Sequence, residues 1–326
     1  MPLCRTAKYA ARIALCLSLA FAGWAQAEEY PSRSIKLLVP AAPGGGADLL
    51  SRVVGQKLSQ QLGVPIVVEN RAGAAGVIAS SALVNSAPDG YTMMMGYSGH
   101  ATNPLFVKQL PYDSVKDFTP VVMAAYTPLM LVVKESFAAK SVRDLIAMAK
   151  AQPGQLQFAS GGRGGGPFMA GLLFRNEAGI DLVHVPYNGN APALNDLLAG
   201  NVTMMFDTIN TSVPQVAAGR LKPLAVTGAK RSALAPGVVT MSEAGLPGFE
   251  VYAWFVLMMP ANVPDAVVRK MNVEFNRALA SPEIRSRLLE SGVEPMGGSV
   301  EEAKKFVTDE MKKWSRVIRE SNLKDD

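Results

Sequence analysis

The sequence predicts an α/β fold with mainly parallel sheets flanked by helices, divided into two lobes that face each other across a cleft. Short β-rich runs alternate with amphipathic helical patterns almost from end to end. Hydrophobic residues make up 49% of the chain and charged residues 18%, a composition that can fill a core. Two stretches in different halves, residues 34–48 and 156–167, share one plan of apolar strand, glycine loop and helix start.

The expected strands follow from apolar, β-branched and aromatic runs bounded by turn residues. In chain order they cover residues 35–39, 66–69, 91–95, 129–133, 156–159, 182–185, 203–206, 223–227 and 251–258. A typical helix between them covers residues 141–151, where Ser141 can cap the N-terminus. From residue 263 onward the pattern predicts helices without further strands, and the last helix, residues 301–320, has one apolar face.

Residues 1–27 predict a cleavable secretory signal peptide. Three basic residues precede an apolar run at 13–22, and Ala25-Gln26-Ala27 forms a cleavage site. We therefore expect a periplasmic protein that begins at Glu28 and, since both cysteines lie in the removed segment, has no thiol or disulfide. Removal also takes three of the 32 basic residues and none of the 27 acidic ones, so the formal charge falls from +5 to 29 − 27 = +2. The basic composition is thus no reason to expect nucleic-acid binding.

A glycine loop before a helix start predicts an anion-binding site. Glycine allows a ligand to approach the backbone closely, and a helix N-terminus leaves unpaired N–H groups with partial positive charge. Both loops follow the carboxyl end of a predicted strand, where the ligands of such sheets bind. We therefore expect two anion-binding ends to face each other. The loop residues are Pro43, Gly44, Gly45, Gly46 and Asp48 in the first loop, and Ser160, Gly161, Gly162 and Arg163 in the second.

Three charged side chains near the loops each have two interpretations. Asp48, in the first helical turn, either complements the dipole of its own helix or orders the loop and bounds the pocket. Asp207, which follows the strand at 203–206, either binds a ligand hydroxyl or amine or caps the next helix. Arg163 is either solvated at the surface or pairs with a second carboxylate. The residues alone leave these alternatives open.

Motifs for nucleotide or metal chemistry are missing from the sequence. Neither glycine loop has the Gly-Lys-Ser/Thr ending of a P-loop or the third glycine of a dinucleotide fingerprint. Two histidines without a cysteine beyond residue 27 give no zinc-ligand spacing, so we expect no metal and no cofactor. Residues 96–100 resemble a nucleophile elbow, and this resemblance keeps a hydrolase using Ser98 as an alternative. The motif is incomplete, because it ends in His100 instead of glycine. His184 lies in a strand pattern and is expected to be a hydrogen-bonded core residue.

The chain resembles the substrate-binding proteins of tripartite tricarboxylate transporters, the Bug family of periplasmic receptors. The resemblance extends from Tyr30-Pro31 to the final helix. One such motif would be weak, whereas the ordered set is highly specific. The matching features, in order, are Pro43-Gly44-Gly45 with Asp48; Val68-Glu69-Asn70-Arg71 with Gly73 and Gly76; Asp89-Gly90-Tyr91; Leu110-Pro111-Tyr112-Asp113; Ala159-Ser160-Gly161-Gly162; Val185-Pro186-Tyr187-Asn188-Gly189; Ala193-Leu194-Asn195-Asp196-Leu197-Leu198-Ala199-Gly200; Phe206-Asp207; Glu243-Ala244-Gly245; and Trp254.

The resemblance implies a type II periplasmic binding protein of the Venus flytrap kind, a receptor and not an enzyme, which closes on a small carboxylate and hands it to membrane permease subunits. In related proteins, loop amides and hydroxyls hold the carboxylate. Where many members carry His-Leu, this chain has Pro167-Phe168, so a ligand contact through that histidine is not carried over. By matching position, the ligand is bound by the residues of both loops and by the rim residues Ser98, Tyr187, Asn188 and Asp207.

The family arrangement places residues 28–125 and 252–326 in the first lobe and residues 126–251 in the second. Crossing strands near Ala124 and Val251 are expected to act as hinges. We expect a monomer without a nucleic-acid partner. A sensory module that presents its closed form to a membrane kinase would use the same pocket, and the sequence does not separate it from a transport receptor.

Overall fold

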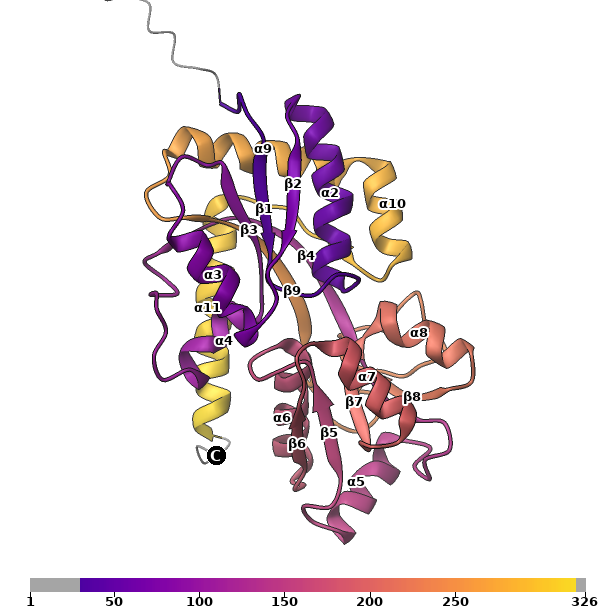
Figure 1. Ribbon diagram of the computed structural model, residues 1–326. Helices are drawn as coiled ribbons and strands as arrows, with labels where there is room; N and C mark the ends of the chain where they lie inside the picture. The colour runs from indigo at the N-terminus through magenta and orange to yellow at the C-terminus, as the bar shows by residue number, and fades with distance from the viewer. Residues whose placement is uncertain (1–29, 321–326) are drawn as a thin grey trace, which may run out of the picture. The chain divides into compact units, whose positions relative to one another are not determined.

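A computed structural model describes residues 30–320, and the predicted signal peptide at residues 1–27 lies outside them. The strands form one continuous sheet with the order β2-β1-β3-β9-β4-β7-β5-β6, and β8 and β10 also pair with β4 (Figure 1). The strands are β1 (Ile35–Val39), β2 (Ile66–Asn70), β3 (Thr92–Tyr97), β4 (Phe118–Lys134), β5 (Gln157–Ser160), β6 (Val183–Pro186), β7 (Met204–Thr208), β8 (Leu221–Val226), β9 (Tyr252–Pro260) and β10 (Glu294–Pro295).

Parallel pairing occurs in two separate parts of the sheet. Strand β1 pairs in parallel with β2 and β3, and β5 pairs in parallel with β6 and β7. All ladders made by β4, and the ladder between β3 and β9, are antiparallel. The predicted α/β fold class is confirmed. Parallel pairing is confined to the two groups of strands that lead into the glycine loops.

Strand β4 is much longer than the segment predicted at residues 129–133. Its first part pairs with β9, from Phe118 opposite Pro260 to Pro128 opposite Tyr252, and its last part pairs with β7 and β8. Proline lacks an N–H group and is rare inside strands. Pro120 and Pro128 therefore argue against a strand when the sequence alone is considered. The register shifts next to Pro120, as expected where a ladder hydrogen bond is missing.

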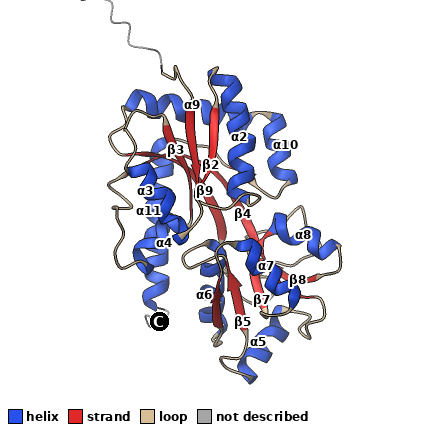
Figure 2. Ribbon diagram, in the orientation of Figure 1, coloured by secondary structure: helices blue, strands red, loops and turns tan. Residues whose placement is uncertain are grey.

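Ten helices of at least eight residues lie in the described part of the chain, and a short 3-10 turn, η1 (Ala74–Gly76), precedes α3 (Figure 2). They are α2 (Gly46–Leu62), α3 (Val77–Val84), α4 (Gly99–Phe106), α5 (Val142–Ala151), α6 (Gly166–Ala178), α7 (Asn190–Ala199), α8 (Ile209–Ala217), α9 (Asp265–Ala280), α10 (Pro282–Glu290) and α11 (Val300–Glu320).

The C-terminal region departs from the all-helical prediction, because β10 pairs with β4 there, with Glu294 opposite Tyr126. Two residues between glycine-containing turns are too few to produce an alternating pattern, so the sequence does not reveal this strand.

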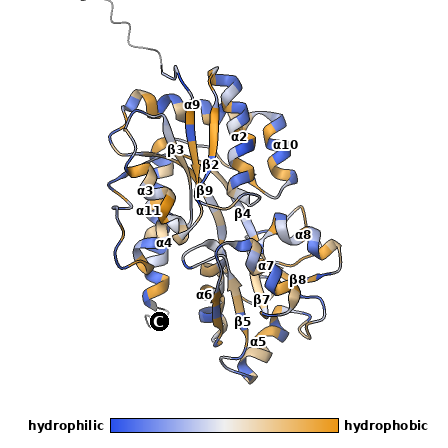
Figure 3. Cartoon of the chain, in the orientation of Figure 1, coloured by the Kyte–Doolittle hydropathy of each residue, from blue (hydrophilic) through white to orange (hydrophobic). Residues whose placement is uncertain are grey.

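Helices cover both faces of the sheet. On β4, Leu129, Leu131 and Val133 pack against α5 and α6, whereas Met130 and Val132 pack against α7 and α8. This alternation is the side-chain period of a strand with two buried faces. Near β1, β3 and β9, one apolar cluster joins the sheet to α3, α4 and α11. Figure 3 shows the apolar residues of β1 and β2 and the mixed surfaces of the covering helices.

Two helix predictions are confirmed in detail. Helix α5 begins directly after Ser141, whose hydroxyl accepts a hydrogen bond from the Asp144 N–H at 3.1 Å. Helix α11 buries its predicted apolar face, and Trp314 is 2% exposed. The indole N–H groups of Trp254 and Trp314 both donate to Glu310 Oε2, at 2.8 and 2.9 Å, which joins α11 to β9. The predicted lobe boundaries and the hinges near Ala124 and Val251 stay predictions.

Candidate functional site

The first glycine loop is braced by one carboxylate. Asp48 is 5% exposed, and its oxygens accept hydrogen bonds from the Gly44 N–H at 3.0 Å, from Arg52 Nε at 3.0 Å and from Asn70 Nδ2 at 2.9 Å. Burial alone raises the pKa of Asp48, but these hydrogen bonds and the Arg52 charge outweigh burial and hold the pKa below its ordinary value. An ionised Asp48 therefore ties the loop to α2 and β2.

The second glycine loop is braced by neutral groups. Ser160 is fully buried, and its hydroxyl lies 2.7 Å from His184 Nε2. Burial, and then the positive charge of Arg163, lower the pKa of His184 to about 4, so the imidazole is neutral at neutral pH. Gly161 lies directly on the start of α7, because a Cβ added there would be 2.7 Å from the Asn190 nitrogen. The predicted core role of His184 is consistent with this packing.

Helix α4 holds the second loop from the other side. The Ser98 hydroxyl accepts a hydrogen bond from the Gly166 N–H at 3.1 Å, and the Thr102 hydroxyl donates to the Gly164 carbonyl at 2.5 Å. Both hydroxyl residues are at most 3% exposed. Phe168, which stands where many family members carry leucine, packs edge-on against Phe106 of α4. The contact between α4 and the start of α6 is thus closely packed.

Both helix starts approach the same strand. A Cβ added to Gly46 would lie 3.3 Å from the Phe255 ring, and one added to Gly166 would lie 3.3 Å from the Ala253 Cα. Ala253 and Phe255 are two residues apart on β9, so they share a face and lie about 7 Å apart along the strand. In Figure 1, β1 and β5 run toward each other, and each leads into one of these loops.

The other predicted site residues lie at the ends of β6 and β7. The Tyr187 hydroxyl donates to Asp196 at 2.6 Å, and this hydrogen bond, with burial, raises the pKa of Tyr187 to about 12. Asn188 is exposed. Asp207 is fully buried and accepts hydrogen bonds from the hydroxyls of Thr211 and Ser212, whereas its Oδ1 has no side-chain partner within residues 30–320. Burial raises the pKa of Asp207 to about 6 despite these hydrogen bonds.

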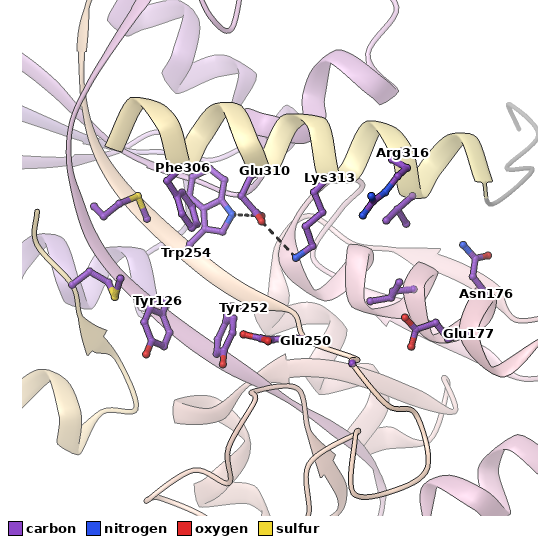
Figure 4. A pocket seen from close by; sticks show the side chains of 15 residues that line it. Tyr126, Asn176, Glu177, Glu250, Tyr252, Trp254, Phe306, Glu310, Lys313 and Arg316 are labelled. Carbon is purple, nitrogen blue, oxygen red and sulfur yellow. Dashed lines mark hydrogen bonds and ion pairs between the residues drawn. The ribbon is translucent and has the colours of Figure 1, made fainter. Parts of the chain in front are cut away.

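Two cavities border these elements. One, of about 450 Å³, lies between the first loop, α8 and α10, and its lining includes Gly44 and Asp48 but no other predicted site residue. The other, of about 930 Å³, lies between α6, β9 and α11, and Figure 4 shows Trp254, Glu310 and Lys313 on its wall. The larger cavity contains none of the predicted site residues within the described part of the chain. The smaller one is the better candidate site, because Gly44 of the first glycine loop and Asp48 of the first turn of α2 line it.

Several residues of this region lie beyond the sequence predictions. Asn210, Arg52 and Arg287 line the smaller cavity, and Thr102 holds the second loop. Asn210 follows a strand end, the same signal that points to Asp207. Arg287 comes from a helix far along the chain, and no local pattern connects it to the first loop.

The Ser98 hydroxyl makes no hydrogen bond with a histidine of residues 30–320. His100 Nε2 is hydrogen-bonded to the Ser114 carbonyl and His184 Nε2 to the Ser160 hydroxyl, whereas the Ser98 hydroxyl accepts a hydrogen bond from the Gly166 N–H. No group of three or more potential metal ligands occurs in the described residues. The same residues contain no helix that is both long and apolar enough to cross a membrane.

Known proteins share this architecture. Residues 50–323 match the family model for the tripartite tricarboxylate transporter family receptor. Protein BugT of Bordetella pertussis is 34% identical over 300 residues, which cover 91% of this chain and 92% of that protein. The structure of R. palustris Rpa4515 with adipate is similar with a TM-score of 0.86 and 36% identity, covering 90% of this chain and 98% of that chain. The structure of MatC (Rpa3494) from Rhodopseudomonas palustris with bound malate is similar with a TM-score of 0.83 and 32% identity. The match covers 89% of this chain and 100% of that chain.

The fold and the similarities together define a two-lobed periplasmic binding protein, a class of solute-binding receptors and not of enzymes. The match extends over most of the sequence and over nearly the whole of each solved neighbour. The chain belongs to the tripartite tricarboxylate transporter receptor family. The resemblance inferred from the ordered motifs is thereby confirmed.

Proposed function

We propose that the chain is exported to the periplasm, captures a small carboxylate at its glycine loops and delivers it to the permease subunits of a tripartite transporter. The packing of the starts of α2 and α6 against Phe255 and Ala253 of β9 carries this proposal, because these two residues lie about 7 Å apart along the strand. Neither helix start has a side-chain cap from the described residues. An oxyanion is the ligand that two such ends favour.

The magnitudes support a backbone-held anion. A micromolar receptor needs about 8 kcal/mol of binding free energy. Two helix ends contribute about 0.3–2 kcal/mol each, and hydrogen bonds to a charged carboxylate add about 1.5–3 kcal/mol each. A ligand that contacts both lobes favours the closed state, because only differential affinity shifts a conformational equilibrium. The related structures with adipate and malate support a carboxylate as the ligand.

A thermal-shift panel of mono-, di- and tricarboxylates tests the proposal, with sugars and simple cations as controls. At least one acid should raise the melting temperature, with a stabilisation of about 2.7 kcal/mol at one hundred times its Kd. Stabilisation by the sugars or cations alone would contradict an anion receptor. Mass spectrometry of acids that co-purify from the periplasm identifies the natural ligand.

Two further measurements test transport and export. Deletion of the gene should abolish uptake of the labelled acid, whereas a sensory module with the same pocket would leave uptake unchanged. The exported protein should begin at Glu28, as measured by intact mass, and a retained N-terminus would contradict cleavage after Ala27.

A further inference from the structure

The 450 Å³ cavity is built from three helix ends. The first glycine loop and the first turn of α2 form one wall, the first half of α8 forms the second, and the last turn of α10 forms the third. Its volume falls within the range of about 300–1,000 Å³ that small-molecule sites occupy. The starts of α2 and α8 contribute partial positive charge, and the end of α10 contributes partial negative charge. The cavity therefore extends from the first loop into a region that can hold the distant end of a ligand.

Arg287 is the cation of this cavity that has no protein partner. Among residues 30–320, its guanidinium makes no hydrogen bond or ion pair, although it lines the cavity. Arg52, by contrast, is bound to Asp48 at 2.9 Å, which neutralises its charge. Glu290 lies three residues after Arg287 and accepts a hydrogen bond from the Ser286 hydroxyl at 2.8 Å. The positive charge that remains available to a ligand in this cavity is therefore that of Arg287.

The opposite wall also has an unsatisfied group. The Asn210 side-chain oxygen is buried and has no hydrogen-bond partner among the described residues. Because that oxygen has almost no exposed surface, it does not itself face the cavity, but Asn210 and Arg287 both line the cavity, from α8 and α10.

We propose that Arg287 binds the second carboxylate of an acid whose first carboxylate lies at the glycine loops, so that the receptor selects acids with at least two carboxylates over monocarboxylates. This inference rests on the proposed function. The planar guanidinium can donate two parallel hydrogen bonds to one carboxylate. Glu290 acts in the opposite sense, because its carboxylate repels the ligand end that Arg287 attracts.

Calorimetric titration with matched acids tests the inference. The probes are adipate with hexanoate, malate with 2-hydroxybutanoate, and citrate, so that each monocarboxylate has the carbon number of its dicarboxylate. In Arg287→Gln, the affinity for the acids with two or more carboxylates should fall about 10- to 100-fold, as expected for lost hydrogen bonds to a charged group. The affinity for a monocarboxylate should change less than about twofold, and Arg287→Lys should recover part of the loss.

The neighbouring residues supply the controls. Arg285→Gln changes an exposed arginine of the same helix that does not line the cavity, and it should leave every affinity unchanged. Glu290→Gln should strengthen binding of the acids with two carboxylates. Melting temperatures of all variants without ligand should match the wild type, which separates a ligand contact from a folding defect.

The outcomes are distinct. Equal losses for both kinds of acid in Arg287→Gln, no loss at all, or a wild type that binds only monocarboxylates would overturn the role of Arg287 while leaving the receptor function intact. Weaker binding in Glu290→Gln would also overturn it, because the ligand end would then carry a positive charge. If no acid binds the wild type, the proposed function itself fails.

Discussion

The two glycine loops share a local plan but are held by different chemistry. The first depends on one ionised carboxylate, Asp48, whose partners all come from nearby α2, β2 and the loop itself. The second depends on the hydroxyls of Ser98, which precedes α4, and of Thr102 in α4, and on close packing against α7. The local sequence of strand, glycine loop and helix start therefore predicts where an anion site can form. Contacts with other parts of the chain determine how each loop is held in place.

The difference also separates local from distant anchors. The first loop is anchored by its own helix α2 and by the neighbouring strand β2. The second loop is anchored partly by α4, whose residues pack with β3 and α11. Substitutions at the anchors of one loop should therefore leave the other loop unchanged, and steric conflict with the backbone should cost more than the loss of a single hydrogen bond.

Gly161→Ala should have the largest effect. The new Cβ would lie 2.7 Å from the Asn190 nitrogen and 2.8 Å from the Gly189 carbonyl carbon, and backbone atoms cannot move away easily. We expect a loss of about 3 kcal/mol in unfolding free energy, with loss of ligand binding. Urea denaturation measures the first and calorimetry the second. Gly45→Ala is the matched control, since its Cβ would meet nothing closer than 4.0 Å, and equal stability of the two variants would contradict the packing of the second loop.

Asp48→Ala should cost about 2 kcal/mol, because it removes the hydrogen bonds that order the first loop. Since the folded-state pKa lies below the ordinary value of 3.8, this stabilisation is present above pH 3.8 and disappears as pH falls through the lowered pKa. Urea denaturation of wild type and variant at neutral and acidic pH measures it. A stability difference that persisted in strong acid would show that the ionised carboxylate is not responsible.

Ser98→Ala should cost about 1–2 kcal/mol, since it leaves the buried Gly166 N–H without its acceptor. Hydrogen exchange should increase at the start of α6 and stay unchanged at the start of α2. Ser81→Ala, a hydroxyl that bonds only to the carbonyl of its own helix, is the control. Equal exchange at both helix starts would remove α4 as a specific anchor of the second loop.

Asp207→Asn should have an effect that depends on pH and is small in acid. Burial raises the pKa of Asp207 to about 6, so the folded chain favours the protonated form, and stability is lost as pH rises from about 4 through 6. The melting temperature of the variant relative to wild type should therefore be higher at pH 8 than at pH 4.5. A difference that does not vary with pH would contradict the raised pKa.

Sequence reasoning locates the elements better than their partners. The prediction of strand 35–39 and of the start of α5 is correct, because an apolar run and a capping serine are local signals. Most of β4 escapes prediction because Pro120 and Pro128 interrupt its pattern. The contact between Thr102 and Gly164 spans 62 residues, and no local signal encodes it. The family motifs point to Ser98 and Tyr187, but only the folded structure reveals that their hydroxyls bond to Gly166 and Asp196.

Trp254 and Trp314 are the only tryptophans outside the predicted signal peptide, and both donate to one oxygen of Glu310. The tryptophan fluorescence of residues 30–320 therefore originates from a single seam between β9 and α11. That seam borders the 930 Å³ cavity, whose opposite wall belongs to α6. We therefore expect a shift of α6 relative to α11 to change the emission wavelength of these two buried indoles, which would report the movement without a chemical label.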